Sequence, residues 1–485
     1  MAKTELKIAG GFSSEREPKI DSQRTINMYV LVNSEGKWNS VLAPMPGLIF
    51  GVSFLGLNNI RSLYTYKDLM YAVASNKIYR IDSNLTPTLL GTINTAVGYI
   101  GVTANETQLI WVDGGNGYIY DTSTSTFSII TAAGFTLNPG DVAFLDGYFI
   151  VTNAITNQFS ISALNDGLNW DALDFEKISS KADTLIGVRV LKRRIFLFGR
   201  KATEVWFNAG AADFPFRRDN NLLLEYGCAS AGSIATGYQK MFWLSGDKNG
   251  VGSVMMTDGT TPIPISNTAI DFKLQNYSNI NDADALVYKI DGHVFYQLNF
   301  TTDNHTWIYD ANTMHWFEGE MLNGDRRITN NHTFFNNKHY VGSYNTPNIY
   351  ELSSFAYTDE LESGVKSPIK RKRITGHFSE SAMRKIRITR VNLDVVPGVG
   401  LRETPETTID TNYSEPSVFL SFSKDGGNLF CNKRKSTLGK SGDRLHRCIY
   451  RRLGSARDWV FCFESICESP VYWLGGSIDY EVSGR

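Results

Sequence analysis

The sequence predicts an all-β protein, a β-propeller followed by a C-terminal antiparallel β-sandwich. Three observations lead to this fold class: the composition, a repeated strand-turn-strand pattern, and a change of charge near residue 365. The 485 residues contain 12% aromatic residues, 42 Gly and only 14 Pro. Aromatic side chains favour pleated, half-buried strands, and Gly favours tight turns. A chain of this length is expected to form more than one domain.

The repeat extends over residues 51–364, where an apolar strand, a polar turn and a second apolar strand recur. Their spacing of roughly 40–50 residues is typical of propeller blades. The pattern predicts about seven blades. Six remain possible, because one sequence does not show whether each unit holds three or four strands. The first turn of each unit is expected near Lys67, Asn105, Asp146, Lys192, Gln239, Asp291 and Asn336.

The two flanking regions differ from the repeat. Residues 1–50 contain an apolar strand at 23–32 and a turn with Pro and Gly at 43–48. We interpret them as an N-terminal arm and strand available to close or brace the propeller. Residues 365–485 contain alternating apolar and polar residues in several short segments, which predicts a small antiparallel sandwich.

The formal charge changes sign between these regions. Residues 1–364 hold 27 Lys and Arg against 36 Asp and Glu, a net of −9, whereas residues 365–485 hold 21 against 13, a net of +8. The basic excess indicates contact with phosphates or with an acidic protein ring, and a solvated linker is the alternative interpretation. The candidate contact residues are Lys370, Arg371, Lys372, Arg373, Lys385 and Arg387.

Strand alternation makes a further prediction for segment 384–391. Side chains along a strand point to opposite faces with a period of two. Lys385, Arg387 and Thr389 should therefore share one face, and Arg384, Ile386, Ile388 and Arg390 the other.

No motif in the sequence indicates catalysis or metal binding. The seven His show no H-x-x-x-H spacing, and the five Cys show no C-x-x-C pair, so zinc-type ligand sets are not expected. We expect no catalytic residue, cofactor or metal ion. Apolar runs stay far below the 18 residues of a membrane span, so no membrane partner is expected.

One short motif fits an Asp-box hairpin, with Ser423, Asp425, Gly427 and Phe430 at the required spacing. We interpret it as a structural turn, in which Asp binds backbone amides, Gly takes a positive φ and the aromatic ring packs underneath. Sialidases carry such turns, so a glycan-binding or glycan-cleaving propeller is the alternative function. That chemistry would need paired carboxylates, for which Asp146 and Glu204 are unsupported candidates.

A family resemblance is visible at both ends of the chain. Ile-Asn-Met at 26–28 and Met-Pro-Gly-Leu at 45–48 resemble the N-terminal signature of tail hub, or head-closure, proteins of short-tailed bacteriophages. These are also called packaged DNA stabilization proteins. The C-terminal segments at 420–426, 450–454 and 469–471 resemble the closing domain of the same family.

The resemblance implies a non-enzymatic virion component that is assembled in the host bacterial cytoplasm and located in the tail. It implies a homo-oligomeric ring, a hexamer in the best-studied relatives, below the portal and adaptor rings. Such a ring extends and closes the DNA channel, retains packaged DNA and supports the needle or fibre proteins. Double-stranded DNA would pass through it without sequence-specific binding.

Overall fold

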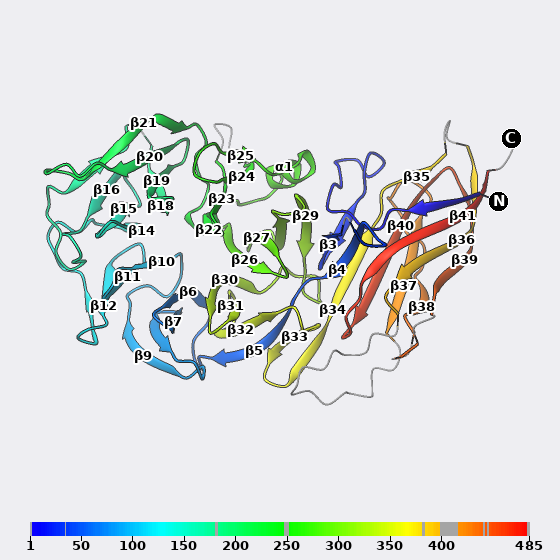
Figure 1. Ribbon diagram of the computed structural model, residues 1–485, viewed down its shortest axis with the longest axis horizontal. Coiled ribbons are helices and arrows are strands. Elements are labelled where there is room, and N and C mark those ends of the chain that lie inside the picture. Colours follow the sequence, from blue (N-terminus) through cyan, green and yellow to red (C-terminus); the bar gives the residue numbers. More distant parts are fainter. Residues whose placement is uncertain are drawn as a thin grey trace.

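The computed structural model describes residues 2–33, 35–179, 183–246, 252–380, 384–397, 416–439, 442–443 and 446–482. Within these ranges the chain is almost entirely β-strand, with one α-helix, α1 (Thr268–Gln275), and one short 3₁₀ turn (Ala231–Ser233). A ring of sheets occupies one end of an elongated molecule, and a sandwich occupies the other (Figure 1).

The described residues form a seven-bladed propeller, in which each blade is a group of four antiparallel strands; five blades are separate four-stranded sheets, and the sixth and seventh belong to one larger sheet. The first blade is β6 (Ile60–Tyr66), β7 (Leu69–Ala74), β8 (Lys77–Ile81) and β9 (Pro87–Thr92). The second is β10 (Gly101–Ala104), β11 (Gln108–Val112), β12 (Gly117–Asp121) and β13 (Thr126–Ile129). The third is β14 (Pro139–Leu145), β15 (Tyr148–Asn153), β16 (Gln158–Ile161) and β17 (Phe175–Lys177). The fourth is β18 (Leu185–Leu191), β19 (Arg194–Gly199), β20 (Thr203–Asn208) and β21 (Phe216–Leu224).

Of the remaining three blades, the sixth and seventh belong to the same hydrogen-bonded sheet as strands of the sandwich. The fifth is β22 (Ala235–Gly237), β23 (Lys240–Leu244), β24 (Val254–Thr257) and β25 (Ile263–Pro264). The sixth is β26 (Asp284–Ile290), β27 (His293–Phe300), β28 (His305–Asp310) and β29 (His315–Gly319). The seventh consists of β30 (Thr329–Phe335), β31 (Lys338–Ser343), β32 (Asn348–Ser353) and the N-terminal strand β5 (Gly47–Ser53). The ring is thus closed by a strand from the opposite end of the sequence.

Tight turns with positive φ set the blade hairpins. Lys192 and Arg193 take φ of 49° and 60°, and Asn336 and Asn337 take 46° and 59°. Two successive residues at positive φ match the right-handed twist of the two strands they join. Gly47, where β5 begins, has a different role: a Cβ there would lie 2.4 Å from the carbonyl oxygen of Thr358. Only Gly allows so close an approach.

Aromatic side chains pack between neighbouring blades. Phe198 and Trp243 lie 5.5 Å apart between the fourth and fifth blades, and Phe242 and Tyr296 stack at 5.0 Å between the fifth and sixth. All four rings are fully buried. Such pairs add to the burial of large apolar areas.

The sandwich consists of two facing groups of strands. One is β3 (Met28–Val32), β4 (Ser40–Pro44), β41 (Trp473–Val482), β36 (Ile386–Val395) and β39 (Cys448–Ala456), and β1 (Ala2–Leu6) also pairs with β41. The other is β34 (Val365–Ile374), β40 (Asp458–Cys467), β37 (Ser417–Ser423) and β38 (Arg434–Thr437), with the short β35 (Phe378–Ser379) paired to β40. Trp459, Phe463 and Trp473 are fully buried between them.

The propeller and the sandwich are joined by hydrogen-bonded strands. β2 (Arg24–Ile26) pairs with β29 of the sixth blade and with β34, and β33 (Thr358–Glu362) pairs with β34 and with β5. Strands on both sides of residues 50 and 364 therefore share one sheet, and the expected domain boundaries stay predictions. No helix among the described residues is long and apolar enough to cross a membrane.

Candidate partner interface

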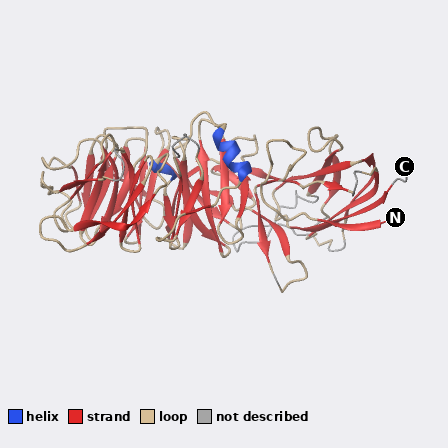
Figure 2. Cartoon of the chain, turned by 90° about the horizontal axis from the view of Figure 1, so that it is seen from above, coloured by secondary structure: helices blue, strands red, loops and turns tan. Residues whose placement is uncertain are grey.

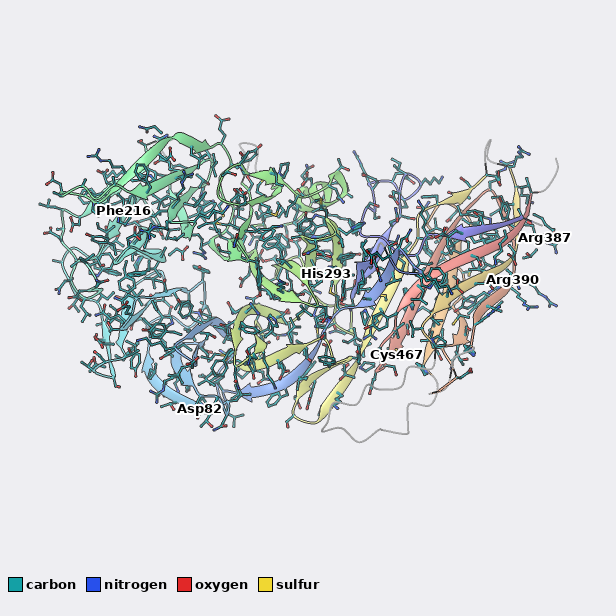
Figure 3. The ribbon with its side chains drawn as sticks, viewed as in Figure 1. Asp82, Phe216, His293, Arg387, Arg390 and Cys467 are labelled. Atoms are coloured by element: carbon teal, nitrogen blue, oxygen red, sulfur yellow. The ribbon has the colours of Figure 1, made fainter. Side chains whose placement is uncertain are left out.

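The basic stretch at 370–373 lies on β34, which is paired along both edges. Arg371 and Arg373 are 0% and 1% exposed. Arg371 Nη1 donates to the carbonyl oxygen of Cys467 at 3.1 Å. Arg373 Nη1 donates to the carbonyl of Gly11 at 2.9 Å, and its Nη2 to Gln23 Oε1 at 2.6 Å. Figure 3 places Cys467 within the sandwich. These guanidinium groups hold strands and the N-terminal segment together.

The expectation that Arg371 and Arg373 touch a partner or DNA is therefore wrong, because neither side chain reaches the surface. Burial lowers the pKa of Arg373 to about 10, as expected for a cation removed from water. Lys370 forms an ion pair with Glu320 of the same chain at 2.6 Å, and Lys372 is partly exposed. A run of Lys and Arg indicates charge. Whether its strand lies at an edge or in the centre depends on segments distant in sequence.

Lys385 and Arg387 are exposed at the start of β36. Figure 3 shows Arg387 and Arg390 at the end of the molecule away from the propeller. Their contact with a partner stays a prediction.

A β-bulge changes the faces that the sequence pattern predicts for this strand. The register of β36 with β39 and with β41 shifts between Ile388 and Arg390. Arg387 lies opposite Glu481, and Arg390 lies opposite Asp479. These two acids are two residues apart on β41 and so share a face. Arg390 therefore lies on the face of Arg387, and the predicted grouping of Arg390 with Ile386 and Ile388 is wrong.

The same bulge exposes two adjacent arginines on β39. Arg451 lies opposite Arg390, and Arg452 takes a φ of 59°. Both side chains are exposed. A non-Gly residue in the left-handed region costs of order 1 kcal/mol or more and persists where the surrounding structure holds it in place. Bulges commonly redirect a side chain in this way.

We call Lys385, Arg387, Arg390, Arg451 and Arg452 the sandwich cluster. Asp479 neutralises Arg390, whose Nε donates to Asp479 Oδ2 at 2.6 Å. Sequence reasoning missed Arg451 and Arg452 as contact candidates. Two adjacent Arg after the buried positions Cys448 and Tyr450 break the alternation of a strand, and that break was the available signal.

The Asp-box segment forms a tight turn next to this cluster. Asp425 Oδ1 accepts from the amides of Asn428 and Leu429, both at 3.1 Å, and Ser423 Oγ accepts from the amide of Gly427 at 2.9 Å. Gly427 has a φ of 94°. Phe430 is 36% exposed, so its ring does not pack beneath the turn as expected.

The carboxylates considered for glycan cleavage are used within the fold. Asp146 forms an ion pair with Arg193 at 2.8 Å. Glu204 is buried and accepts from the amide of Ser179 and from Trp206 Nε1, both at 2.9 Å. Neither carboxylate lines the axial cavity of the propeller. In the described part of the chain, no group of three His, Cys, Asp or Glu is arranged to hold a metal ion.

The axial cavity has a volume of 380 Å³ and is lined by residues from the innermost strands of all seven blades. Tyr99 and Arg189 line its wall and form a polar network with the buried Asp141. Tyr99 donates to Asp141 Oδ1 at 3.1 Å, and Arg189 Nη2 donates to the Tyr99 hydroxyl at 2.6 Å. Arg189 also forms an ion pair with Asp141. The network links the second, third and fourth blades, as a structural tie would.

Comparison with known proteins agrees with this architecture. Residues 4–357 match the sequence model described as Bacteriophage P22 Gp10, beta-propeller. Residues 370–481 match the one described as Bacteriophage P22 Gp10, beta-sandwich. No curated protein matches the chain. Among solved structures, the crystal structure of the computationally designed Ika8 protein is 11% identical, with a TM-score of 0.40 over 63% of this chain and 99% of that chain. The two family matches cover nearly all of the sequence in the order in which the two folds occur, and the chain thus belongs to the bacteriophage P22 Gp10 family, the tail hub proteins of short-tailed phage virions.

Proposed function

We propose that several copies of this chain, six by analogy with its family, form a ring below the portal and adaptor rings of a phage particle. The ring extends and closes the DNA channel, retains the packaged DNA and supports the needle or fibre proteins. The observation that carries this proposal is the match of both domains, in order, to a tail hub family.

The way the two domains are joined supports a load-bearing role. Strand β34 is hydrogen bonded to β2 and β33 on one side and to β40 on the other. The buried ion pair of Arg327 with Asp359, at 3.3 Å, connects the segment before the seventh blade to β33. A link made of paired strands and buried charges bends less than a flexible linker. A rigid link between the propeller and the sandwich suits a tail component that must resist the pressure of packaged DNA.

The charge distribution supports a channel through which DNA slides. Each phosphate neutralised by Lys or Arg adds affinity through counterion release. Residues 1–364 carry a net charge of −9 and therefore have little affinity for DNA phosphates. DNA would therefore pass the propeller without being gripped.

Particles assembled with and without this chain test the proposal. We expect particles without it to fill with DNA and then lose it, measured as nuclease-sensitive DNA after packaging. Supplying the chain before packaging ends should restore retention and place a ring of density below the adaptor. Two outcomes would contradict the proposed function. One is that particles assembled without the chain keep their DNA, and the other is that tails assembled in its presence do not contain it.

A further inference from the structure

The propeller contains a long acidic tract. Residues 81–176 include no Lys or Arg, although the whole chain has 48. The tract covers β9 and almost all of the second and third blades. Its acidic residues are Asp82, Glu106, Asp113, Asp121, Asp141, Asp146, Asp166, Asp171, Asp174 and Glu176. Arg189 and Arg193 of the fourth blade neutralise Asp141 and Asp146, and four of the remaining acids, Asp166, Asp171, Asp174 and Glu176, lie close together in the sequence at the end of the tract.

That end is an exposed surface in which acids alternate with apolar side chains. Between β16 and β17, Leu164 and Leu173 are 59% and 83% exposed, and Phe175 on β17 is 36% exposed. Asp171, which precedes Leu173, and Glu176, which follows Phe175, are also exposed. Burial and the neighbouring Asp171 raise the pKa of Asp174, as expected where carboxylates are crowded. We call this the acidic leucine surface; it comprises Leu164, Asp166, Leu168, Asp171, Leu173 and Asp174, together with Phe175 and Glu176, which flank the outer edge of β17 on its two faces.

The open edge of β17 belongs to the same surface. In the third blade the strand order ends at β17, all three residues of which are exposed. Exposed apolar side chains beside a free strand edge mark a surface that another protein covers.

The sandwich presents the complementary combination at its far end. Leu429 is 77% and Phe430 36% exposed on the Asp-box turn, and Lys424 on that turn is exposed. A Cβ at Gly454 would lie 2.8 Å from Lys424 Nζ, so the turn adjoins the bulge that carries the two exposed arginines. We call the combined area the basic end surface; it comprises the sandwich cluster with Lys424, Leu429 and Phe430.

The two surfaces lie at opposite ends of the long axis and cannot meet within one chain. The third blade is at one end and β36 to β39 at the other in Figure 1, and the view from above in Figure 2 keeps the propeller and sandwich at these ends. Contact between them therefore requires two copies. Such a contact is heterologous, with different patches on the two partners, and heterologous contacts form a ring when the rotation from copy to copy closes.

We propose that the basic end surface of one copy docks on the acidic leucine surface of the next copy. The inference rests on the ring proposed above and assigns its subunit interface. Charge complementarity steers the encounter and fixes the register, and the exposed leucines and phenylalanines supply the buried apolar anchors. A second copy suits the basic end surface better than a phosphate backbone does, because Leu429 and Phe430 have no partner on phosphate.

Charge reversal on each surface tests this interface. The acidic variant carries Asp171→Lys and Glu176→Lys, and the basic variant carries Arg451→Glu and Arg452→Glu. We expect each variant alone to lose the ring and sediment as a monomer. An equimolar mixture should recover ring formation with the two variants alternating, because every contact then joins either two unmodified surfaces or two reversed ones.

A chain with all four changes restores complementarity, since its two surfaces have exchanged sign. We expect that chain to recover ring formation in sedimentation velocity. The control carries Glu35→Lys and Glu362→Lys, two exposed acids outside both surfaces, which change the net charge as the acidic variant does. The control should assemble like the unmodified chain. Rings that persist in both two-residue variants, or are lost equally in the control, would overturn the interface.

If the unmodified chain is monomeric in solution, carbodiimide crosslinking of assembled tails tests the proposed interface instead. We expect peptides with Asp171 or Glu176 joined to peptides with Lys385 or Lys424, and such links must join two copies. Tails whose copies crosslink only elsewhere would overturn the interface and leave the proposed function intact. Tails without this chain would overturn the proposed function instead.

Discussion

Replacing Arg24 by methionine should weaken the attachment of the N-terminal segment to the sixth blade. Arg24 on β2 donates from Nε to Glu318 Oε2 at 2.8 Å and from Nη2 to Oε1 at 2.7 Å. The Glu318 side chain is 3% exposed and that of Arg24 is 34% exposed. His305 Nε2 lies 3.2 Å from Glu318 Oε1. Removal of the guanidinium leaves a buried carboxylate with one remaining side-chain partner.

The pKa of Glu318 sets the expected size and pH dependence of this effect. Burial alone would raise the pKa, but the charge of Arg24 and hydrogen bonds from His305 and Arg24 hold it at about 2, below the usual 4.5. That difference corresponds to about 3 kcal/mol of stability. Because Arg24 is partly exposed, screening reduces it, and we expect Arg24→Met to lower the free energy of unfolding by about 2 kcal/mol at pH 7.

A carboxyl whose folded pKa is depressed stabilises the fold above its unfolded pKa and loses that contribution as pH falls through the folded value. The gap between the unmodified chain and Arg24→Met should therefore shrink as pH falls from 4.5 toward 2. Urea unfolding followed by circular dichroism measures the gap, and hydrogen exchange of the β2 amides localises it.

Arg193→Met is the matched control for this experiment. The Arg193–Asp146 distance is also 2.8 Å, but the Arg193 side chain is 79% exposed. An exposed pair of this kind contributes less than about 1 kcal/mol. If Arg24→Met and Arg193→Met unfold at the same urea concentration at pH 7, or if the gap does not change with pH, the reasoning about the buried pair is refuted.

Three further changes test other parts of the structure. Arg373→Glu places an unpaired buried charge beside β40 and should yield insoluble protein. Arg387→Glu, on the surface, should fold and melt like the unmodified chain. Soluble yield and near-ultraviolet circular dichroism distinguish the two variants. Burial raises the pKa of Asp284 to about 7, so its contribution to stability is lost as pH rises from about 4 to 7, and Asp284→Asn should flatten the urea-unfolding profile there and gain about 1 kcal/mol at pH 8. A profile that keeps its slope would contradict this assignment. Asp425→Ala removes the acceptor of two turn amides and should cost about 1 kcal/mol, whereas Leu429→Ala on the same turn, at a side chain that is 77% exposed, should leave the unfolding midpoint unchanged.

Local chemistry explains which parts of the fold could be predicted. The turns expected near Lys192, Asp291 and Asn336 lie at or beside residues with positive φ in the structure. Their signal is contained in two or three residues between apolar runs, and a single sequence displays it. The blade count remained open because β5 lies far in sequence from the three strands that it completes.

The candidate interface was predictable only in part, because exposure is not a property of the local sequence. Lys385 and Arg387 lie on the surface as the charge pattern indicates. Arg371 and Arg373 have the same local signal and are buried by strands from elsewhere in the chain.

The sequence by itself determined the strand content, the turn positions and the separation of charge between the two parts of the chain. Each of these depends on residue type and on neighbours within a few positions. Only the tertiary structure decided that the N-terminal segment closes the propeller and covers β34, and that a bulge brings Arg390 and Arg451 to one face. These outcomes depend on which distant strands pair and in which register, and a shift of one residue in register exchanges the two faces of a strand.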